Sequence, residues 1–133
     1  MVKKTIYLFL ATAAIFTACK KDDTTVTKTT AQKVLGKWGV VSEVTVSYRS
    51  GVATTYTLPG AATDYADFRT DGKIYFYVEN KYDTSTYKII NNQSITIDAD
   101  SAQIKTLTDN SFVLEEKYYN GSDSTKSTIS LKK

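Results

Sequence analysis

The sequence from residue 38 to residue 48 reads Trp38-Gly39-Val40-Val41-Ser42-Glu43-Val44-Thr45-Val46-Ser47-Tyr48. Its even-numbered positions are mainly large and apolar, whereas the odd-numbered positions include Glu43, Thr45 and Ser47. Successive side chains of a strand point to opposite faces, so this period of two predicts a strand with one buried face and one face in water. Valine, threonine and tyrosine also favour strands.

The same alternation recurs through the rest of the chain. Further strands are predicted at 52–58, 74–78, 87–89, 95–97, 112–118 and 129–131, with a weaker one at about 65–69. The segment 103–108 is irregular because Ile104 and Leu107 fall on opposite parities, which a β-bulge or an edge strand explains. The chain is therefore predicted to be all-β.

Turn-forming pairs separate these runs of alternating residues. They are Ser50-Gly51, Pro59-Gly60, Asp71-Gly72, Asn91-Asn92, Asp109-Asn110 and Asn120-Gly121. Asp-Gly and Asn-Gly tolerate the positive φ of tight hairpins, so the predicted order is an antiparallel meander.

The meander has eight or nine strands in roughly 100 residues, which leaves no room for the crossover helices of a parallel sheet. An open sheet of that size would leave two unpaired edges and one bare apolar face, so it closes into a barrel or folds into a sandwich. We favour the closed barrel, whose interior holds either packed side chains or one small ligand.

The first residues have the pattern of an export signal. Lys3 and Lys4 precede an uncharged apolar run that ends in Thr17-Ala18, directly before Cys19. The run is shorter than the roughly 20 residues of a membrane-spanning helix, so a cleaved secretory signal peptide is predicted. Cys19 is the only cysteine of the chain, and an unpaired thiol is unusual in an exported protein.

The segment Ile15-Phe16-Thr17-Ala18-Cys19 resembles the lipobox of bacterial lipoproteins. This resemblance implies that residues 1–18 are removed and that Cys19 carries a covalent lipid, which anchors the protein to the outer membrane on its periplasmic or its surface-exposed face. The polar segment 19–30 is then a disordered, lipidated tether, and residues 31–133 form the barrel domain, beginning with one helical turn at 32–35. A plain signal peptide with an incidental buried cysteine is the alternative.

Two motifs of the folded part resemble the lipocalin-like domains of bacterial lipoproteins. One is Leu35-Gly36-Lys37-Trp38, which is similar to the Leu-x-Gly-x-Trp opening of that family, and the other is the Phe-x-x-Asp-Gly hairpin of residues 68–72. The resemblance implies a barrel that binds a small molecule. In lipocalins the signature tryptophan closes one barrel end under an arginine of the last strand, where this chain offers Lys132.

Composition excludes many other functions. The chain has no histidine, which excludes histidine-based catalysis and histidine-ligated metals. The net charge falls from +3 to about +1 when Lys3 and Lys4 leave with the signal, so no nucleic-acid partner is expected. Glu115 and Glu116 point to opposite faces of one strand, which separates them as an acid–base pair. We therefore expect neither an enzyme nor a metal site, and no cofactor beyond the lipid on Cys19.

Two functions remain. The first is binding of a small apolar or amphipathic ligand inside the barrel, with the following candidate lining residues: Trp38, Val40, Tyr56, Phe68, Phe76, Tyr87, Phe112 and Tyr118. The alternative is a solid-cored barrel that serves as an interaction or accessory module of an envelope or surface assembly, with an envelope protein as its partner. A cavity of about 300 Å³ or more favours the first, and a filled interior favours the second.

Overall fold

The computed structural model describes residues 27–133, so the predicted signal peptide, Cys19 and most of the predicted tether lie outside the described residues. One short helix, α1 (Thr30–Val34), precedes the strands. The strands are β1 (Gly36–Arg49), β2 (Val52–Pro59), β3 (Tyr65–Phe68), β4 (Lys73–Val78), β5 (Lys81–Asn91), β6 (Ser94–Ile97), β7 (Asp100–Leu107), β8 (Ser111–Asn120) and β9 (Asp123–Lys132). Within residues 27–133 no helix has the length and hydropathy that a membrane span requires.

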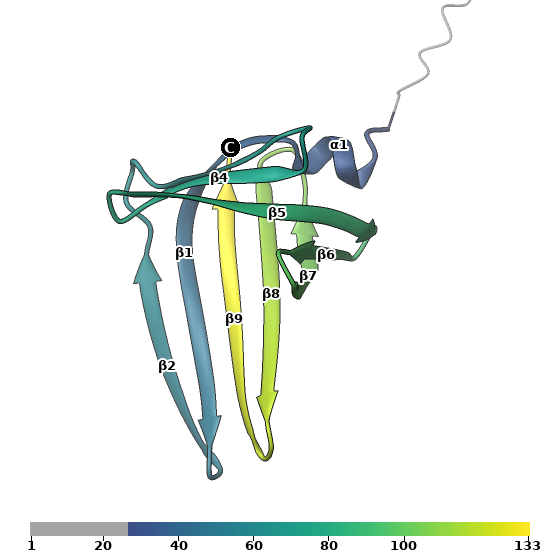
Figure 1. The fold of residues 1–133 in the computed structure, drawn as a ribbon. Coiled ribbons are helices and arrows are strands. Elements are labelled where there is room, and N and C mark those ends of the chain that lie inside the picture. Colours follow the sequence, from purple (N-terminus) through teal and green to yellow (C-terminus); the bar gives the residue numbers. More distant parts are fainter. Residues whose placement is uncertain (1–26) are drawn as a thin grey trace, which may run out of the picture.

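Eight of these strands close into an antiparallel barrel, as the sequence predicts. From β3 to β9 each strand pairs with the next, and β1 closes the ring by pairing with both β3 and β9. The ninth strand, β2, is an addition to the ring, because it pairs only with the second half of β1. Figure 1 shows that β2, β1, β9 and β8 run side by side beyond the rest of the barrel. We call this extension the projecting sheet.

A β-bulge at Val41 changes which side chains of β1 face the interior. Val40 pairs with Leu131 of β9 and Ser42 pairs with Ser130, so Val41 is the extra residue. A bulge reverses the alternation of the following side chains. The prediction that the even-numbered positions stay buried is therefore correct only as far as Val40, and Glu43 turns inward instead.

The projecting sheet also explains why β2 is not half-buried, as its alternation had predicted. Val52 and Tyr56 are each about two-thirds exposed, and Leu58 is the one residue of β2 that is partly buried. Nothing among the described residues packs over this strand at its outer edge, where it has no neighbouring strand.

The sequence predicted the irregularity of β7 near Ile104, but it did not predict the turns that follow β4 and β6. The register of β7 against β8 shifts between Ile104 and Thr106, which is the β-bulge that the sequence indicated. The hairpin between β4 and β5 turns at Glu79 and Asn80, both with positive φ, and the hairpin after β6 turns at Asp98 with φ 53°. Neither turn contains glycine, so the sequence lacked the usual signal.

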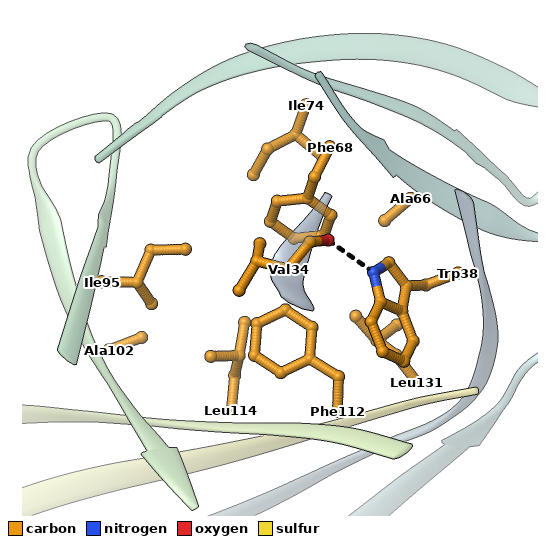
Figure 2. Close-up of a cluster of buried hydrophobic side chains, with 10 residues drawn as sticks. All are labelled: Val34, Trp38, Ala66, Phe68, Ile74, Ile95, Ala102, Phe112, Leu114 and Leu131. Carbon is orange, nitrogen blue, oxygen red and sulfur yellow. Dashed lines mark hydrogen bonds between the residues drawn. The ribbon is translucent and has the colours of Figure 1, made fainter. Parts of the chain in front are cut away.

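The core fills the barrel end that lies next to α1. Its fully buried aromatic residues are Trp38, Phe68 and Phe112, with ring centroids of neighbouring pairs 5.4 and 5.5 Å apart. Figure 2 shows Val34 of α1 pointing into the middle of this cluster. The indole Nε1 of Trp38 donates a hydrogen bond to the carbonyl oxygen of Val34 at 2.7 Å, so the helix is fastened to the strand that follows it.

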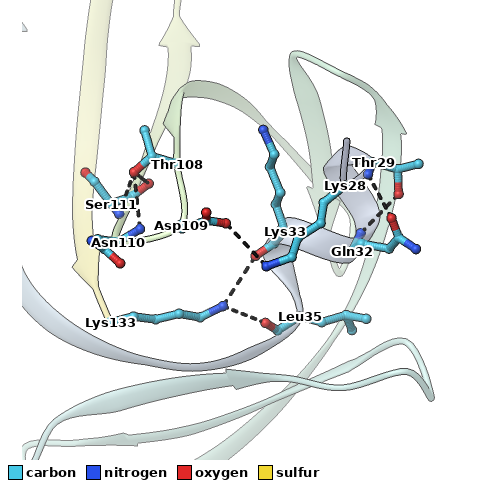
Figure 3. Close-up of polar contacts among 10 residues, drawn as sticks. All are labelled: Lys28, Thr29, Gln32, Lys33, Leu35, Thr108, Asp109, Asn110, Ser111 and Lys133. Carbon is cyan, nitrogen blue, oxygen red and sulfur yellow. Dashed lines mark hydrogen bonds and ion pairs between the residues drawn. The ribbon is translucent and has the colours of Figure 1, made fainter. Parts of the chain in front are cut away.

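The helix is also fixed from outside (Figure 3). Thr29, which the sequence places in the tether, caps α1 in a reciprocal pair with Gln32, and Lys28 forms an exposed ion pair with Asp109 at 3.5 Å. Lys133 Nζ donates to the carbonyl oxygens of Leu35 at 2.8 Å and of Lys33 at 3.4 Å. These contacts hold α1 and the residues next to it against the turn between β7 and β8 and against Lys133.

The cation above the Trp38 ring is Lys133, whereas the sequence had pointed to Lys132. Lys133 Nζ lies 4.1 Å from the centre of the Trp38 ring. Lys132 pairs with Gly39, whose position alternates with those of Trp38 and Val40, so Lys132 faces the outside of the barrel. Partial burial lowers the pKa of Lys133, the charge of Lys28 lowers it further, and Asp109 opposes both effects.

Candidate functional site

The interior of the barrel beyond the core, away from α1, contains a cavity of about 220 Å³ that is open on one side. Its walls are mostly apolar and come from β1, β3, β4, β6, β8 and β9 and from the end of β2. The apolar lining residues are Val40, Leu58, Pro59, Ala66, Phe68, Phe76, Val78, Ile97, Leu114, Ile129 and Leu131. One end of the barrel is thus packed, and the other contains an open space with mostly apolar walls.

Three carboxylates share this cavity with the apolar walls. They belong to Glu43 of β1, Glu116 of β8 and Asp64, which lies just before β3. Glu43 faces inward only because of the bulge at Val41, and Glu116 follows Leu114 at the normal spacing of two. No lysine or arginine is among the residues that line the cavity.

The two glutamates flank β9, and each accepts one hydrogen bond from a neutral hydroxyl. Ser127 Oγ of β9 donates to Glu43 Oε1 at 2.7 Å, and the Tyr118 hydroxyl donates to Glu116 Oε2 at 2.9 Å. Ser127 also pairs across the strands with Glu116. Burial raises the pKa of Tyr118 to about 12, with a further contribution from its hydrogen bond to Glu116. The two carboxylates therefore stand at one mouth, on either side of one strand.

Asp64 has a different role, because backbone donors satisfy its carboxylate. It is 5% exposed and accepts from the amide of Ala61 at 2.9 Å and from the amide of Glu79 at 3.3 Å. These bonds join the loop after β2 to the turn after β4. Asp64 thus holds one rim of the cavity in place, and its charge is already offset by amide dipoles.

The structure brings three of the predicted lining residues to the cavity, namely Val40, Phe68 and Phe76. Trp38 and Phe112 lie in the packed core, where Phe68 also contributes. Tyr87 packs edge-on against Phe68 and donates its hydroxyl to the Arg69 carbonyl.

The two remaining candidates, Tyr56 and Tyr118, lie on the projecting sheet and are 64% and 44% exposed. They are not part of the cavity wall.

Sequence reasoning missed both glutamates. Nothing in the sequence indicated that Glu43 faces the interior. The alternation of residues 38–48 places this odd-numbered position on the outer face, and a bulge without glycine or proline cannot be recognised from the sequence. Glu116 could have been found, since it shares the parity of Phe112 and Leu114.

Asp98, in the turn after β6, accepts from the amide of Thr86 at 2.8 Å and from its hydroxyl at 3.1 Å. The amide hydrogen bond from Thr86 is the main cause of the lowered pKa of Asp98. The aspartate therefore braces the turn between β6 and β7. Within residues 27–133 no group of three or more Asp, Glu, Cys or His side chains could hold a metal ion.

Comparison with models of protein families gave no match to this chain, and comparison with curated proteins gave none either.

Proposed function

We propose that this protein is a lipid-anchored, lipocalin-like carrier that holds a small apolar or amphipathic molecule near the bacterial outer membrane. The observation that carries the proposal is the open cavity of about 220 Å³ with mostly apolar walls. Apolar walls with a few polar groups are typical of ligand pockets. The contact of Trp38 with Lys133 supports the lipocalin resemblance, with a lysine where lipocalins place an arginine.

The size of the cavity limits what it can hold. It is smaller than the roughly 300–1,000 Å³ of ordinary small-molecule pockets, and smaller than the volume that we expected of a carrier. The ligand is therefore either small or only partly enclosed. In the second case its outer part would lie along the inward face of the projecting sheet, next to Leu58 and Glu43.

A second candidate function is that of an accessory module in an envelope assembly. It is favoured by the packed half of the barrel and by the outer edge of β2, which carries no charged residue. Uncharged edges with unpaired amides and carbonyls are sites where another strand can add.

Native mass spectrometry tests the carrier function. We expect the protein purified from the cells that make it naturally to retain a small molecule, because an apolar cavity holds an apolar ligand against dilution. Ile129→Trp, which places a larger side chain on the cavity wall, is expected to abolish retention. Bare protein for the native sequence, at the same yield and fold, would argue against a carrier.

The anchor is tested separately with Cys19→Ala. We expect this change to move the protein from the membrane fraction to the soluble fraction, because several acyl chains at about 0.8 kcal/mol for each buried CH₂ group provide the attachment. Fractionation followed by immunoblotting measures the shift, and Thr17→Ser serves as a control that keeps the thiol. Continued membrane association of Cys19→Ala would refute the lipid anchor.

A further inference from the structure

We infer that the cavity selects an organic cation, namely a molecule with a small apolar body and a protonated amine that lies between Glu43 and Glu116. This inference rests on the proposed carrier function and specifies the chemistry of its ligand. Its basis is the excess of negative charge in an otherwise apolar site.

The two glutamates are incompletely paired. Among residues 27–133 neither forms an ion pair, and each has a single hydroxyl donor on one of its two oxygens. Glu115, the neighbour of Glu116 on the outer face, is different, because Lys117 lies 3.4 Å and Lys105 4.0 Å from its carboxylate. The chain thus neutralises the outward glutamate and leaves the two inward ones available.

Placing carboxylates in such a wall is unfavourable unless a partner compensates. Both glutamates are partly buried and have lost some of their contact with water, and one neutral hydroxyl replaces only part of the lost hydrogen bonding. Glu43 would face water if β1 had no bulge at Val41, and it would then leave the cavity. A cationic group of the ligand supplies the missing partner, since hydrogen bonds between charged groups are roughly twice as strong as neutral ones.

The arrangement of the site also determines which way the ligand lies. Phe68 and Phe76 are on the wall nearest the packed core, whereas Glu43 and Glu116 stand where the projecting sheet begins. An apolar body would therefore enter first, and the amine would remain at the mouth, near water. An anionic head group in the same place would meet two like charges and be rejected.

Calorimetric titration of the purified full chain with octylammonium chloride, 1-octanol and sodium octanoate tests this inference. The three probes share one alkyl chain and differ in the charge of the head group. We expect octylammonium to bind about tenfold more tightly than octanol, because one charge-assisted hydrogen bond corresponds to about one decade of affinity. Octanoate is expected to bind more weakly than both.

The variants Glu43→Gln and Glu116→Gln keep the shape of the wall and remove its charge. We expect the double variant to bind octylammonium no more tightly than octanol, and its continued binding of octanol shows that the cavity is intact. Glu115→Gln is the matched control, since it removes a charge from the outer face of the same strand and is expected to leave all three affinities unchanged.

The possible results separate the inference from the proposed function. If native protein binds octanol and octylammonium equally, the preference for cations is overturned and the carrier function stands. If the double variant keeps the native preference, the two glutamates are not its source and the inference fails. If no probe binds, the cavity is not an apolar ligand site, and both the inference and the carrier function are overturned.

Discussion

Replacing Trp38 with alanine is expected to lower the free energy of unfolding by about 3–5 kcal/mol. The indole is fully buried, packs 5.4 Å from Phe112 and holds α1 through the carbonyl oxygen of Val34. Removing the indole leaves a cavity in the core and also removes the hydrogen bond that holds α1. Urea denaturation followed by far-ultraviolet circular dichroism measures the change.

A second, milder variant is needed because a domain of this size has a total stability of only about 5–15 kcal/mol, and Trp38→Ala could unfold it completely. Trp38→Phe keeps most of the apolar volume and leaves the Val34 carbonyl without its donor, so we expect a loss of about 1–3 kcal/mol. The control is Tyr82→Ala, at a position that is 80% exposed and whose ring packs against Tyr77 at a centroid distance of 4.6 Å, with an expected loss of only about 0.5–1.5 kcal/mol. Equal losses for Trp38→Ala and Tyr82→Ala would contradict the role of Trp38 as the core anchor.

Gly60→Ala is expected to destabilise the protein by about 1–3 kcal/mol and to weaken ligand retention as well. A Cβ atom at residue 60 would collide with the carbonyl oxygen of Val40 and lie 2.6 Å from its carbon. These are backbone atoms, so the loop that forms one rim of the cavity must move. The amide of Gly60, which donates to the Val41 carbonyl at 2.9 Å, would move with it.

Gly39→Ala provides the matched control for this prediction. Residue 39 lies in the same strand as Val40, and a Cβ there would meet its nearest atom, the Lys132 carbonyl oxygen, at an ordinary 3.7 Å. We expect its stability to stay within about 0.5 kcal/mol of the native value and its ligand to be retained. If Gly60→Ala has the native stability and retains the ligand as the native protein does, the loop can move without loss of free energy and the prediction is wrong.

The fold could be predicted from this sequence because each signal was local. Alternation of apolar residues marked the strands, and pairs such as Asp71-Gly72 marked the turns. Even the bulge in β7 left a trace, since Ile104 and Leu107 break the alternation. A meander of neighbouring strands requires little more than this, because each strand pairs with the next.

The cavity was harder to predict because it depends on two events with no local signal. The first is the bulge at Val41, which turns Glu43 from the surface to the interior. The second is the change of partner along β1, which pairs with β3 at its start and with β2 from Ser42 onward. The strand that pairs with each part of β1 is decided by competition between strands for the same edge of β1. The alternating pattern of β1 does not distinguish one partner from another. Tyr56 was accordingly assigned to the barrel wall, although it lies on the projecting sheet.

The separation of the packed end from the open end has a consequence for how this protein can change over time. Trp38, Val34 and Lys133 hold the closed end, whereas Glu43 and Glu116 stand at the mouth, outside the buried core cluster. Substitutions of these two residues can therefore accumulate without unfolding the barrel, so under the proposed carrier function descendants of this chain could bind a different molecule while inheriting the same scaffold.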